Sequence, residues 1–356
     1  MASWQQNEGV ALPSDTVGQP AGNGVDRAKT VGEVGERALI AMFTAATSGR
    51  SDLPEGADIV IGSGDDAAVL DVGPTVISTD TAVQGRHFRL EWSTAGQIGA
   101  RAVVQSAADI AAMGGRTVGI VVALACPPQT TVGWLVDLDT AIVDAAHRLG
   151  ARVLGGDLVA ADEVVVSITA VGTLDGRSPV TMSGARPGDV LAVSGPLGAA
   201  AAGLAVISRS GVSAMPRWTR NADPRAHVVS AFLLPEPDLG QGVLAATAGA
   251  HAMTDISDGL IEELITLAAA SDVSLAITSN MVPRLAAVAA VAALLGVDAR
   301  TWALTGGEDH ELLAAFAPDA LPPGWHVIGE IGAGPARVTI DGRDVGGLHG
   351  WQAFDH

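Results

Sequence analysis

Aspartates beside glycine or other small residues recur along this sequence, and they define a candidate site for metal ions and phosphate. Asp66 lies in the segment 62–67 and Asp80 in the segment 78–81, with an apolar stretch, 69–77, between them. We interpret both acidic segments as turns at the ends of strands. Two carboxylates about 4 Å apart repel each other by roughly 4 kcal/mol at an effective dielectric of 20. A fold that gathers several of them must solvate them or place cations between them.

Three later segments repeat this combination of glycine and acid, and each has a plain structural alternative. GGD at 155–157 and GGED at 306–309 also suit exposed turns, and DISDG at 255–259 offers Ser257 or Asp258 as an ordinary helix N-cap. A helix N-terminus also attracts phosphate, and an adjacent acid can hold the accompanying metal. Together the segments favour divalent cations, because Mg²⁺ is commonly held by a few carboxylates and substrate phosphates.

Asp109 differs from these residues because it lies one turn before the end of an apolar helix, in QSAADIAAMGG. A carboxylate there is poorly solvated and close to the negative end of the helix dipole. Neighbouring amides could satisfy it, but a cation is the better explanation.

The charge balance limits the kinds of partner that this chain can have. The 356 residues carry 39 acidic and 20 basic side chains, a net charge of −19, and Lys29 is the only lysine. Binding of nucleic acid relies on a basic face, so nucleic acid is not an expected partner. P-loop, kinase-type and Schiff-base lysines have no credible candidate either. Arginines, backbone amides or metal ions must therefore neutralise any bound phosphate.

A dinucleotide-binding site is the main rival interpretation of the first acidic segment. Residues 62–67 match GxGxxA after a strand, but that fingerprint has to open a helix. The residues that follow, AVLDVGPTVI, favour a strand, so we reject this alternative.

Helical and strand patterns alternate along the chain and predict two domains, an α/β domain followed by an α+β domain. We expect a flexible tail over 1–28, a first domain over 29–182 and an α+β domain with a mixed sheet over 183–356, with a Pro/Gly-rich break at the boundary. Helices are expected near 33–47, 94–113 and 131–149 in the first domain. The segment 209–224 is expected to be a loop.

Other features point to a soluble cytoplasmic protein. Cys126 is the single cysteine, which excludes a disulfide framework and a cysteine-based zinc site. No apolar run reaches the roughly 18 residues of a membrane span, and the first residues do not form a signal peptide. We therefore expect no membrane partner.

The ordered motifs resemble one family, the thiamine-monophosphate kinases, within the aminoimidazole-ribonucleotide-synthetase-like ATP-binding superfamily. The resemblance runs from about residue 30 to the C-terminus. It rests on GDDAAVL (64–70), STDTAVQGRHF (78–88), SAADIAAMG (106–114), GGD (155–157), SGARPGD (183–189), DISDGL (255–260) and GGEDHEL (306–312). It implies ATP-dependent phosphorylation of thiamine monophosphate to thiamine diphosphate with several Mg²⁺ ions.

The resemblance also implies roles for individual residues. The implied metal ligands are Asp66, Ser78, Thr79, Asp80, Asp109, Asp157, Asp255 and Asp258, of which Asp80, Asp157 and Asp258 are the residues expected to be catalytic. The implied ATP contacts are Gly156, Asp157 and Ser257, and the implied substrate contacts are His87, Glu308 and Trp351.

The family fold pairs the first domain's sheet across a homodimer into a barrel and places ATP between the two domains. This sequence departs from the family at Met182, where an ATP-contacting arginine is usual. This departure keeps open a non-catalytic nucleotide- or thiamine-binding module. Another ATP-using enzyme of the superfamily, such as aminoimidazole ribonucleotide synthetase, is a second alternative, which matches less well at STDTAVQGRHF and GGEDHEL.

Overall fold

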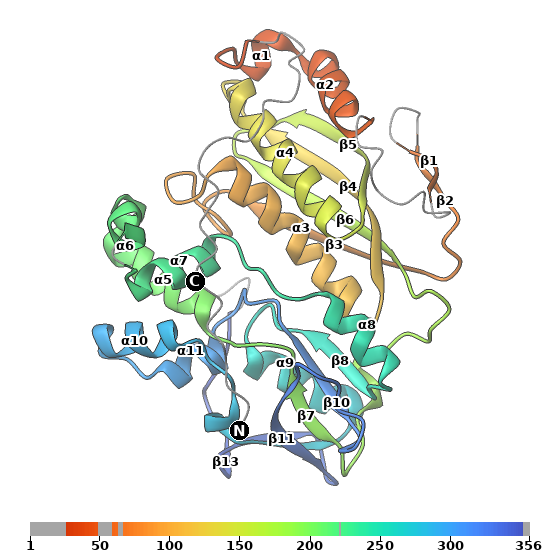
Figure 1. Ribbon diagram of the computed structural model, residues 1–356, viewed down its shortest axis with the longest axis vertical. Helices are drawn as coiled ribbons and strands as arrows, with labels where there is room; N and C mark the ends of the chain where they lie inside the picture. Colours follow the sequence, from red (N-terminus) through yellow and green to blue (C-terminus); the bar gives the residue numbers. More distant parts are fainter. Residues whose placement is uncertain (1–25, 49–58, 63–66, 221, 352–356) are drawn as a thin grey trace.

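The structure is a computed structural model that describes residues 26–48, 59–62, 67–220 and 222–351 (Figure 1). Asp66 and residues 1–25 of the expected tail lie outside the described residues.

The first half of the chain forms a four-stranded mixed sheet covered by helices. The sheet order is β3-β6-β4-β5, in which only β4 and β5 run parallel. Its strands are β3 (Thr75–Val83), β4 (Arg116–Cys126), β5 (Arg152–Ala160) and β6 (Val165–Thr173). The long helices α3 (Ala95–Ala112) and α4 (Val132–Arg148) lie in front of this sheet in Figure 1. Helices α1 (Val31–Val34) and α2 (Glu36–Ser48) precede a small pair of strands, β1 (Ile59–Ile61) and β2 (Val69–Leu70).

Local sequence explains why the two long helices begin where they do. The hydroxyl of Thr94 accepts a hydrogen bond from the Gln97 backbone amide, and the side-chain oxygen of Gln97 accepts one from the Thr94 backbone amide. Thr131 caps α4 in a similar way by accepting from the Trp134 amide. Such N-caps typically contribute about 1 kcal/mol each. The predicted start of α3 at residue 94 and of α4 at residue 131 is confirmed.

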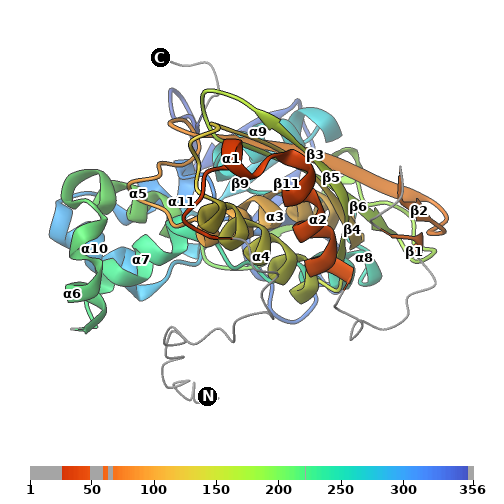
Figure 2. The ribbon, with the colours of Figure 1, turned by 90° about the horizontal axis from the view of Figure 1, so that it is seen from above.

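The second half forms a seven-stranded mixed sheet, in the order β13-β12-β9-β11-β7-β10-β8. Its strands are β7 (Val190–Val193), β8 (Ala252–Asp255), β9 (Ser274–Ile277), β10 (Leu312–Phe316), β11 (His326–Gly332), β12 (Arg337–Ile340) and β13 (Arg343–Asp344). The helices are α5 (Ala199–Ser210), α6 (Met215–Arg220), α7 (Pro224–Leu233), α8 (Gly240–Thr247), α9 (Leu260–Ser271), α10 (Ala286–Leu295) and α11 (Ala299–Thr305). Figure 2 shows α5, α6, α7 and α10 gathered at the end of the molecule opposite β1 and β2.

The two halves share part of their cores. Most buried apolar residues of the first half surround α3, α4 and the four-stranded sheet. The C-terminal end of α3 belongs to a different cluster, in which Ala111 and Ala112 pack with Met253, Phe316 and other residues of the second half. The α3 helix therefore bridges the halves. The short turns η1 (Met182–Gly184), η2 (Val212–Ala214) and η3 (Ser279–Met281) complete the described elements, and the boundary after residue 182 stays a prediction.

Three sequence-based expectations about local structure are wrong. Asp80 and Asp157 lie within β3 and β5, not in turns at strand ends. The segment 209–224 is not a loop, because it contains η2 and α6. The residue at the N-cap of α9 is Gly259, so neither Ser257 nor Asp258 is used there.

Among the described residues, no single helix is long and apolar enough to cross a membrane, although the bent pair α10 and α11 meets the length and composition requirement jointly.

Phe316 offers a test of the second core. It is fully buried on β10, with its ring edge-on to Trp325 at a centroid distance of 5.0 Å. Phe316→Ala should lower the free energy of unfolding by about 3–5 kcal/mol, because it leaves a cavity in a close-packed core. Denaturant titration would measure this. Leu294→Ala, at a side chain that is 62% exposed, is the control and should change stability by about 0.5 kcal/mol or less.

Candidate active site between the two halves

Asp80 lies on the covered face of β3. Residues along this edge strand alternate between half-buried and exposed, and Asp80 shares the half-buried side with Ser78. The Oδ2 atom of Asp80 is buried, and no described residue gives it a hydrogen bond. Burial raises the pKa of Asp80, and the nearby carboxylates of Asp255 and Glu308 act in the same direction. An unsatisfied buried carboxylate oxygen is costly, so this atom is suited to a positively charged ligand.

Asp109, on the last turn of α3, faces the same space. Its Oδ2 accepts a hydrogen bond from the Ser78 hydroxyl. Burial raises the pKa of Asp109 to about 6, with a further contribution from the carboxylates of Asp255 and Asp80. The apolar surroundings predicted from the sequence are thus confirmed, and the helix brings Asp109 to the two site residues of β3.

A chain of charged side chains connects the second half to α3. His310 lies between two acids, with Nδ1 3.4 Å from Asp255 Oδ2 and Nε2 3.3 Å from Glu308 Oε2. Arg101 of α3 forms an ion pair with the same oxygen of Glu308 at 2.8 Å. Burial alone would lower the pKa of His310, but the bonds to Asp255 and Glu308 raise it to about 10. Burial alone would raise the pKa of Glu308, but the charges of Arg101 and His310 outweigh it and hold that pKa well below its usual range.

The loop that carries Glu308 and His310 has an unusual backbone. Both residues adopt the left-handed conformation, with φ of 73° and 54°. This conformation is unfavourable for residues other than glycine and typically marks functional sites. Tight packing holds it in place, because a Cβ on Gly307 would lie 2.3 Å from the Ser257 carbonyl oxygen. The buried Asp309 anchors the loop from the other side by accepting the Gly198 and Ala200 amides at the start of α5.

The predicted substrate contacts meet the predicted metal ligands at Asp258. The backbone amide of Trp351 donates to the Asp258 carbonyl oxygen at 2.9 Å. The indole of Trp351 lies edge-on to the His87 ring, at a centroid distance of 5.9 Å. His87 Nδ1 accepts the Val83 amide at 3.1 Å, so a neutral His87 presents Nε2–H as a donor. Burial raises the pKa of Asp258, and the carboxylates of Glu308 and Asp255 add to this.

The structure therefore brings together most of the residues predicted for the site. The members of this acid cluster lie on β3, α3, the β8–α9 turn and the loop before β10: Asp80, Asp109, Asp255, Asp258 and Glu308. Burial raises the pKa values of Asp80, Asp109 and Asp258, and repulsion from neighbouring carboxylates adds to this. Ser78, Ser257, His87 and Trp351 lie directly beside them through the contacts above.

Within one chain, the acid cluster does not include three of the predicted site residues: Asp157, Gly156 and Thr79. Cross-strand partners place Asp157 in one row with Ala123, Ser167 and Thr81, on the exposed face of the sheet. Thr79 is exposed on that same face. Gly156 lies in the row of Asp80, but three strand spacings of about 4.8 Å separate the two edges of the sheet.

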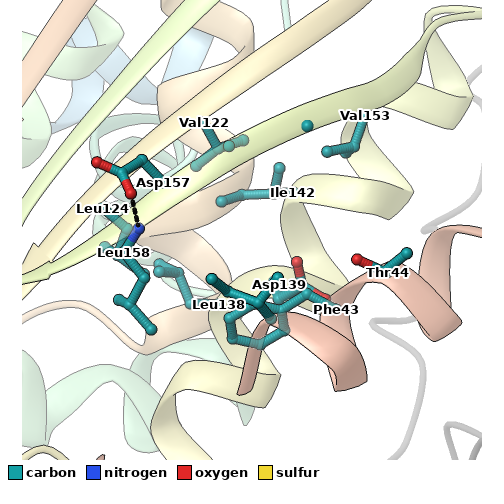
Figure 3. Close-up of a pocket in the computed structure, with 13 residues that line it drawn as sticks. Phe43, Thr44, Val122, Leu124, Leu138, Asp139, Ile142, Val153, Asp157 and Leu158 are labelled. Atoms are coloured by element: carbon teal, nitrogen blue, oxygen red, sulfur yellow. Dashed lines mark hydrogen bonds between the residues drawn. The ribbon is translucent and has the colours of Figure 1, made fainter. Parts of the chain in front are cut away.

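An apolar pocket of about 90 Å³ lies beside Gly156, between α2, α4 and the sheet. Figure 3 shows Phe43 and Asp139 on its helical wall, while the Asp157 carboxyl points away from its apolar side chains. Asp139 is the charged side chain that lines this pocket from α4. Burial raises the pKa of Asp139 to about 7, and no hydrogen bond or ion pair from the described residues offsets this.

No three His, Cys, Asp or Glu side chains of the described residues converge closely enough to hold a metal ion by themselves. The donor set nevertheless fits Mg²⁺. This ion keeps several waters and is usually held by one or two carboxylates together with substrate phosphates. Among the buried side-chain atoms of the described residues that lack a hydrogen-bond partner, Oδ2 of Asp80 is the one carboxylate oxygen.

Sequence reasoning missed Arg101, Gln105 and His310. The signal for the first two was present, because positions 101, 105 and 109 recur every fourth residue and so share one face of a helix with Asp109. The role of His310 depends on acids 55 and 2 residues away in sequence, and the spacing alone does not reveal it.

Comparison with known proteins defines the class of this fold and site. Residues 64–174 match the N-terminal domain of AIR synthase related proteins, and residues 186–341 match their C-terminal domain. The chain is therefore built from the two domains of that class, with mixed sheets in both halves.

Within this class, the chain belongs to the thiamine-monophosphate kinase family. It is 43% identical over 301 residues to the thiamine-monophosphate kinase of Mycobacterium tuberculosis (strain CDC 1551 / Oshkosh), which covers 84% of this chain and 87% of that protein. The solved thiamine-monophosphate kinase of Stenotrophomonas maltophilia K279a has 31% identity and a TM-score of 0.73, covering 86% of this chain and 96% of that one. A structure described as "AaThiL complexed with AMPPCP and TMP" has 25% identity and a TM-score of 0.73, covering 90% and 98%. The family resemblance seen in the sequence motifs is confirmed.

Asp139 gives the site a testable pH dependence. Its pKa is about 7 in the folded protein and 3.8 as a free side chain, so between these values the folded state holds a proton that the unfolded state has lost. Stability should therefore fall as pH rises from about 4 to 7 and level off above. Asp139→Asn should remove this contribution and be more stable than the wild type at pH 8, by on the order of 3 kcal/mol.

Thermal unfolding of both proteins across pH 4–8 would measure this. Asp137→Asn, at an exposed position on the same helix, is the matched control and should leave the pH profile of the wild type intact. Parallel profiles for the wild type and Asp139→Asn would contradict the assignment.

Proposed function

We propose that this protein transfers the γ-phosphoryl group of ATP to the phosphate of thiamine monophosphate, which yields thiamine diphosphate. The 43% identity to a thiamine-monophosphate kinase across 84% of the chain is the observation that carries the proposal. The likeness to a structure whose description names AMPPCP and TMP supports both substrates. The acid cluster between the two halves supports the chemistry, because transfer between two phosphates needs charge neutralisation more than a strong base.

Several Mg²⁺ ions belong to the proposal. Ser78, Asp80, Asp109, Asp255 and Asp258 would hold them on the covered side of the sheet, with Thr79 and Asp157 contributing from the other face at its edges and Asp66 from the adjoining segment. When bound, such ions would supply positive charge to neutralise the phosphate oxygens beside these carboxylates. The pKa values of Asp80, Asp109 and Asp258 are raised, as expected for carboxyl groups of a cation-binding site when no cation is bound.

The chain's own side chains orient the two phosphates and exclude water. The acceptor is already an anionic phosphate oxygen, so an in-line transfer requires little proton movement. His87 can donate from Nε2 to the acceptor phosphate, and the indole of Trp351 beside it offers a flat surface for an aromatic ring. Glu308, which stays ionised, suits the positively charged thiazolium or an amino group of the substrate.

The pocket beside Gly156 is proposed to hold the base of ATP. Its walls are apolar side chains of α2, α4 and β5, which suit a flat ring, and the isolated Asp139 carboxyl suits the amino group of adenine. Because a Cβ on Gly156 would lie 2.2 Å from the Val122 carbonyl oxygen, only glycine fits there without displacing the strand. The ATP contact implied for Gly156 is consistent with this placement.

A homodimer in the cytoplasm completes the proposal. The base pocket and Asp157 lie at the β5 edge, whereas the acid cluster lies at the β3 edge. If β3 of one protomer pairs with β5 of the other, the Asp157 backbone of one chain comes within one strand spacing, about 4.8 Å, of β3 of its partner, with the Asp157 side chain on the face of Thr79. Two such pairings close eight strands into a barrel. Three exposed apolar side chains on the uncovered face support this: Ile77 (65% exposed), Val121 (39%) and Val159 (51%).

A single assay tests the activity. Purified protein incubated with ATP, Mg²⁺ and thiamine monophosphate should form thiamine diphosphate and ADP, detected by chromatography. EDTA should abolish turnover and excess Mg²⁺ should restore it, because the carboxylates alone repel the phosphates. Binding of ATP and thiamine monophosphate without product would favour the non-catalytic module. Turnover of ATP with formylglycinamidine ribonucleotide instead would favour an aminoimidazole ribonucleotide synthetase.

Complementation tests the shared site. Asp80→Asn and Asp157→Asn should each lose nearly all activity while keeping the fold. If each site combines Asp80 of one chain with Asp157 of its partner, a mixed dimer of the two variants has one intact site of its two. Equal co-expression should then restore about one quarter of wild-type activity, because about half of the dimers are mixed.

Two outcomes would count against this arrangement. A mixture as inactive as its components would show that each site uses one chain only. Near wild-type activity of both single variants at millimolar Mg²⁺ would remove the metal-ligand assignment. Co-expression of Asp80→Asn with Asp80→Asn/Asp157→Asn is the matched control and should stay inactive, since no pairing of these chains supplies Asp80.

A further inference from the structure

Two side chains of α3 hold one oxygen of Glu308. Arg101 lies 2.8 Å from Glu308 Oε2, and the Gln105 amide donates to the same atom at 2.9 Å. Arg101 and Gln105 are one helical turn apart, and Asp109 follows a turn later on the same stripe. The α3 helix therefore carries both the residues that hold Glu308 and Asp109 of the acid cluster. Along the helix axis Arg101 and Asp109 are about 12 Å apart, at 1.5 Å per residue.

The contacts of Glu308 are one-sided. Its hydrogen bonds and ion pairs with Arg101, Gln105 and His310 all end on Oε2. The other oxygen, Oε1, has no partner among the described residues, and the side chain remains 30% exposed. The left-handed backbone at this residue is fixed as well, because its amide donates to the Ser257 carbonyl oxygen at 2.7 Å. The carboxylate thus has one restrained oxygen and one that is free to accept a ligand.

Arg101 is itself restrained on its far side. Its side chain is 7% exposed. It donates to the Phe232 carbonyl oxygen at 3.3 Å, and its guanidinium lies 5.2 Å from the centre of the Phe232 ring. A planar guanidinium with two anchors has little freedom, so it fixes the direction of Glu308 more strictly than a flexible ammonium would.

We propose that Arg101 and Gln105 are positioning residues for the phosphate acceptor. They hold Glu308 turned so that Oε1 meets a donor or the positive ring of thiamine monophosphate, at a distance from Asp109 that α3 sets. This inference rests on the proposed function, and it assigns a task to two residues whose side chains contact Glu308. Through these contacts α3, a helix of the first half, sets the orientation of Glu308, a proposed substrate-binding residue of the second half.

The competing explanation is that the Arg101–Glu308 ion pair only joins the two halves of the chain. In that case its loss would lower stability and affect both substrates alike. Positioning predicts a split, in which recognition of the acceptor suffers and recognition of ATP does not.

Steady-state kinetics of variants separates the two explanations. Arg101→Met and Gln105→Leu should each raise the KM for thiamine monophosphate by about tenfold or more, with the KM for ATP changed by less than about twofold. Arg101→Lys should recover part of the loss, because an ammonium can reach one oxygen but does not form the planar fork. Arg116→Met, which removes the ion pair with Asp175 outside the site, is the matched control and should leave both KM values unchanged.

A double variant shows whether Arg101 acts through Glu308. Adding Glu308→Gln to Arg101→Met should worsen the KM for thiamine monophosphate by less than about twofold beyond the stronger single variant, because the two residues form one unit. Multiplied effects, or equal changes in both KM values, would overturn the proposal. If Arg101→Met does not fold, Gln105→Leu decides the outcome alone.

Failure of this inference and failure of the proposed function give different results. If the wild type forms no thiamine diphosphate, the proposed function fails. If the wild type is active and Gln105→Leu has wild-type KM values, only the positioning role is wrong.

Discussion

Repulsion between carboxylates is the constraint on which this structure depends. Five acids from four separate segments face one space between the two halves. Left alone, they would push those segments apart or take up protons. Two buried cations, Arg101 and His310, offset part of this charge, and both act on the Glu308 end of the cluster. At the Asp80 and Asp109 end the charge of His310 acts only from a distance, and no cation among the described residues forms an ion pair with either carboxylate. Added positive charge would be most favourable there.

The α3 helix makes this arrangement possible because it belongs to both halves. One side packs on the four-stranded sheet and α4, while its last turn enters the core around Met253 and Phe316. A third face of the helix carries the polar site residues Arg101, Gln105 and Asp109. Any shift of one half against the other would have to move this helix within two close-packed cores, and such cores resist small displacements. The site geometry is therefore tied to the packing of the whole chain.

Sequence reasoning reached the elements and the kind of chemistry, but not the arrangement in space. Cap residues such as Thr94 and the apolar run of β4 act locally, so their effect is readable from neighbouring residues. Asp80 and Asp157 were interpreted as turn residues because adjacent glycines and small residues are typical of turns, yet sheet pairing extends both strands through them. That the two acids lie on opposite edges follows from the strand order, which no local pattern encodes. Helix α10 was missed because its run of alanine, valine and leucine has no polar face to show a helical period.

The left-handed backbone at Glu308 has an evolutionary consequence. Such a conformation costs of the order of 1–3 kcal/mol at a residue with a side chain, so glycine at this position would relieve strain while removing the carboxylate. Natural drift at residue 308 is thus expected to favour a sturdier protein with a poorer site. Retention of glutamate at this position therefore indicates continuing selection for catalytic activity. Replacement by glycine in a related protein would indicate that the activity has been lost while the fold is kept.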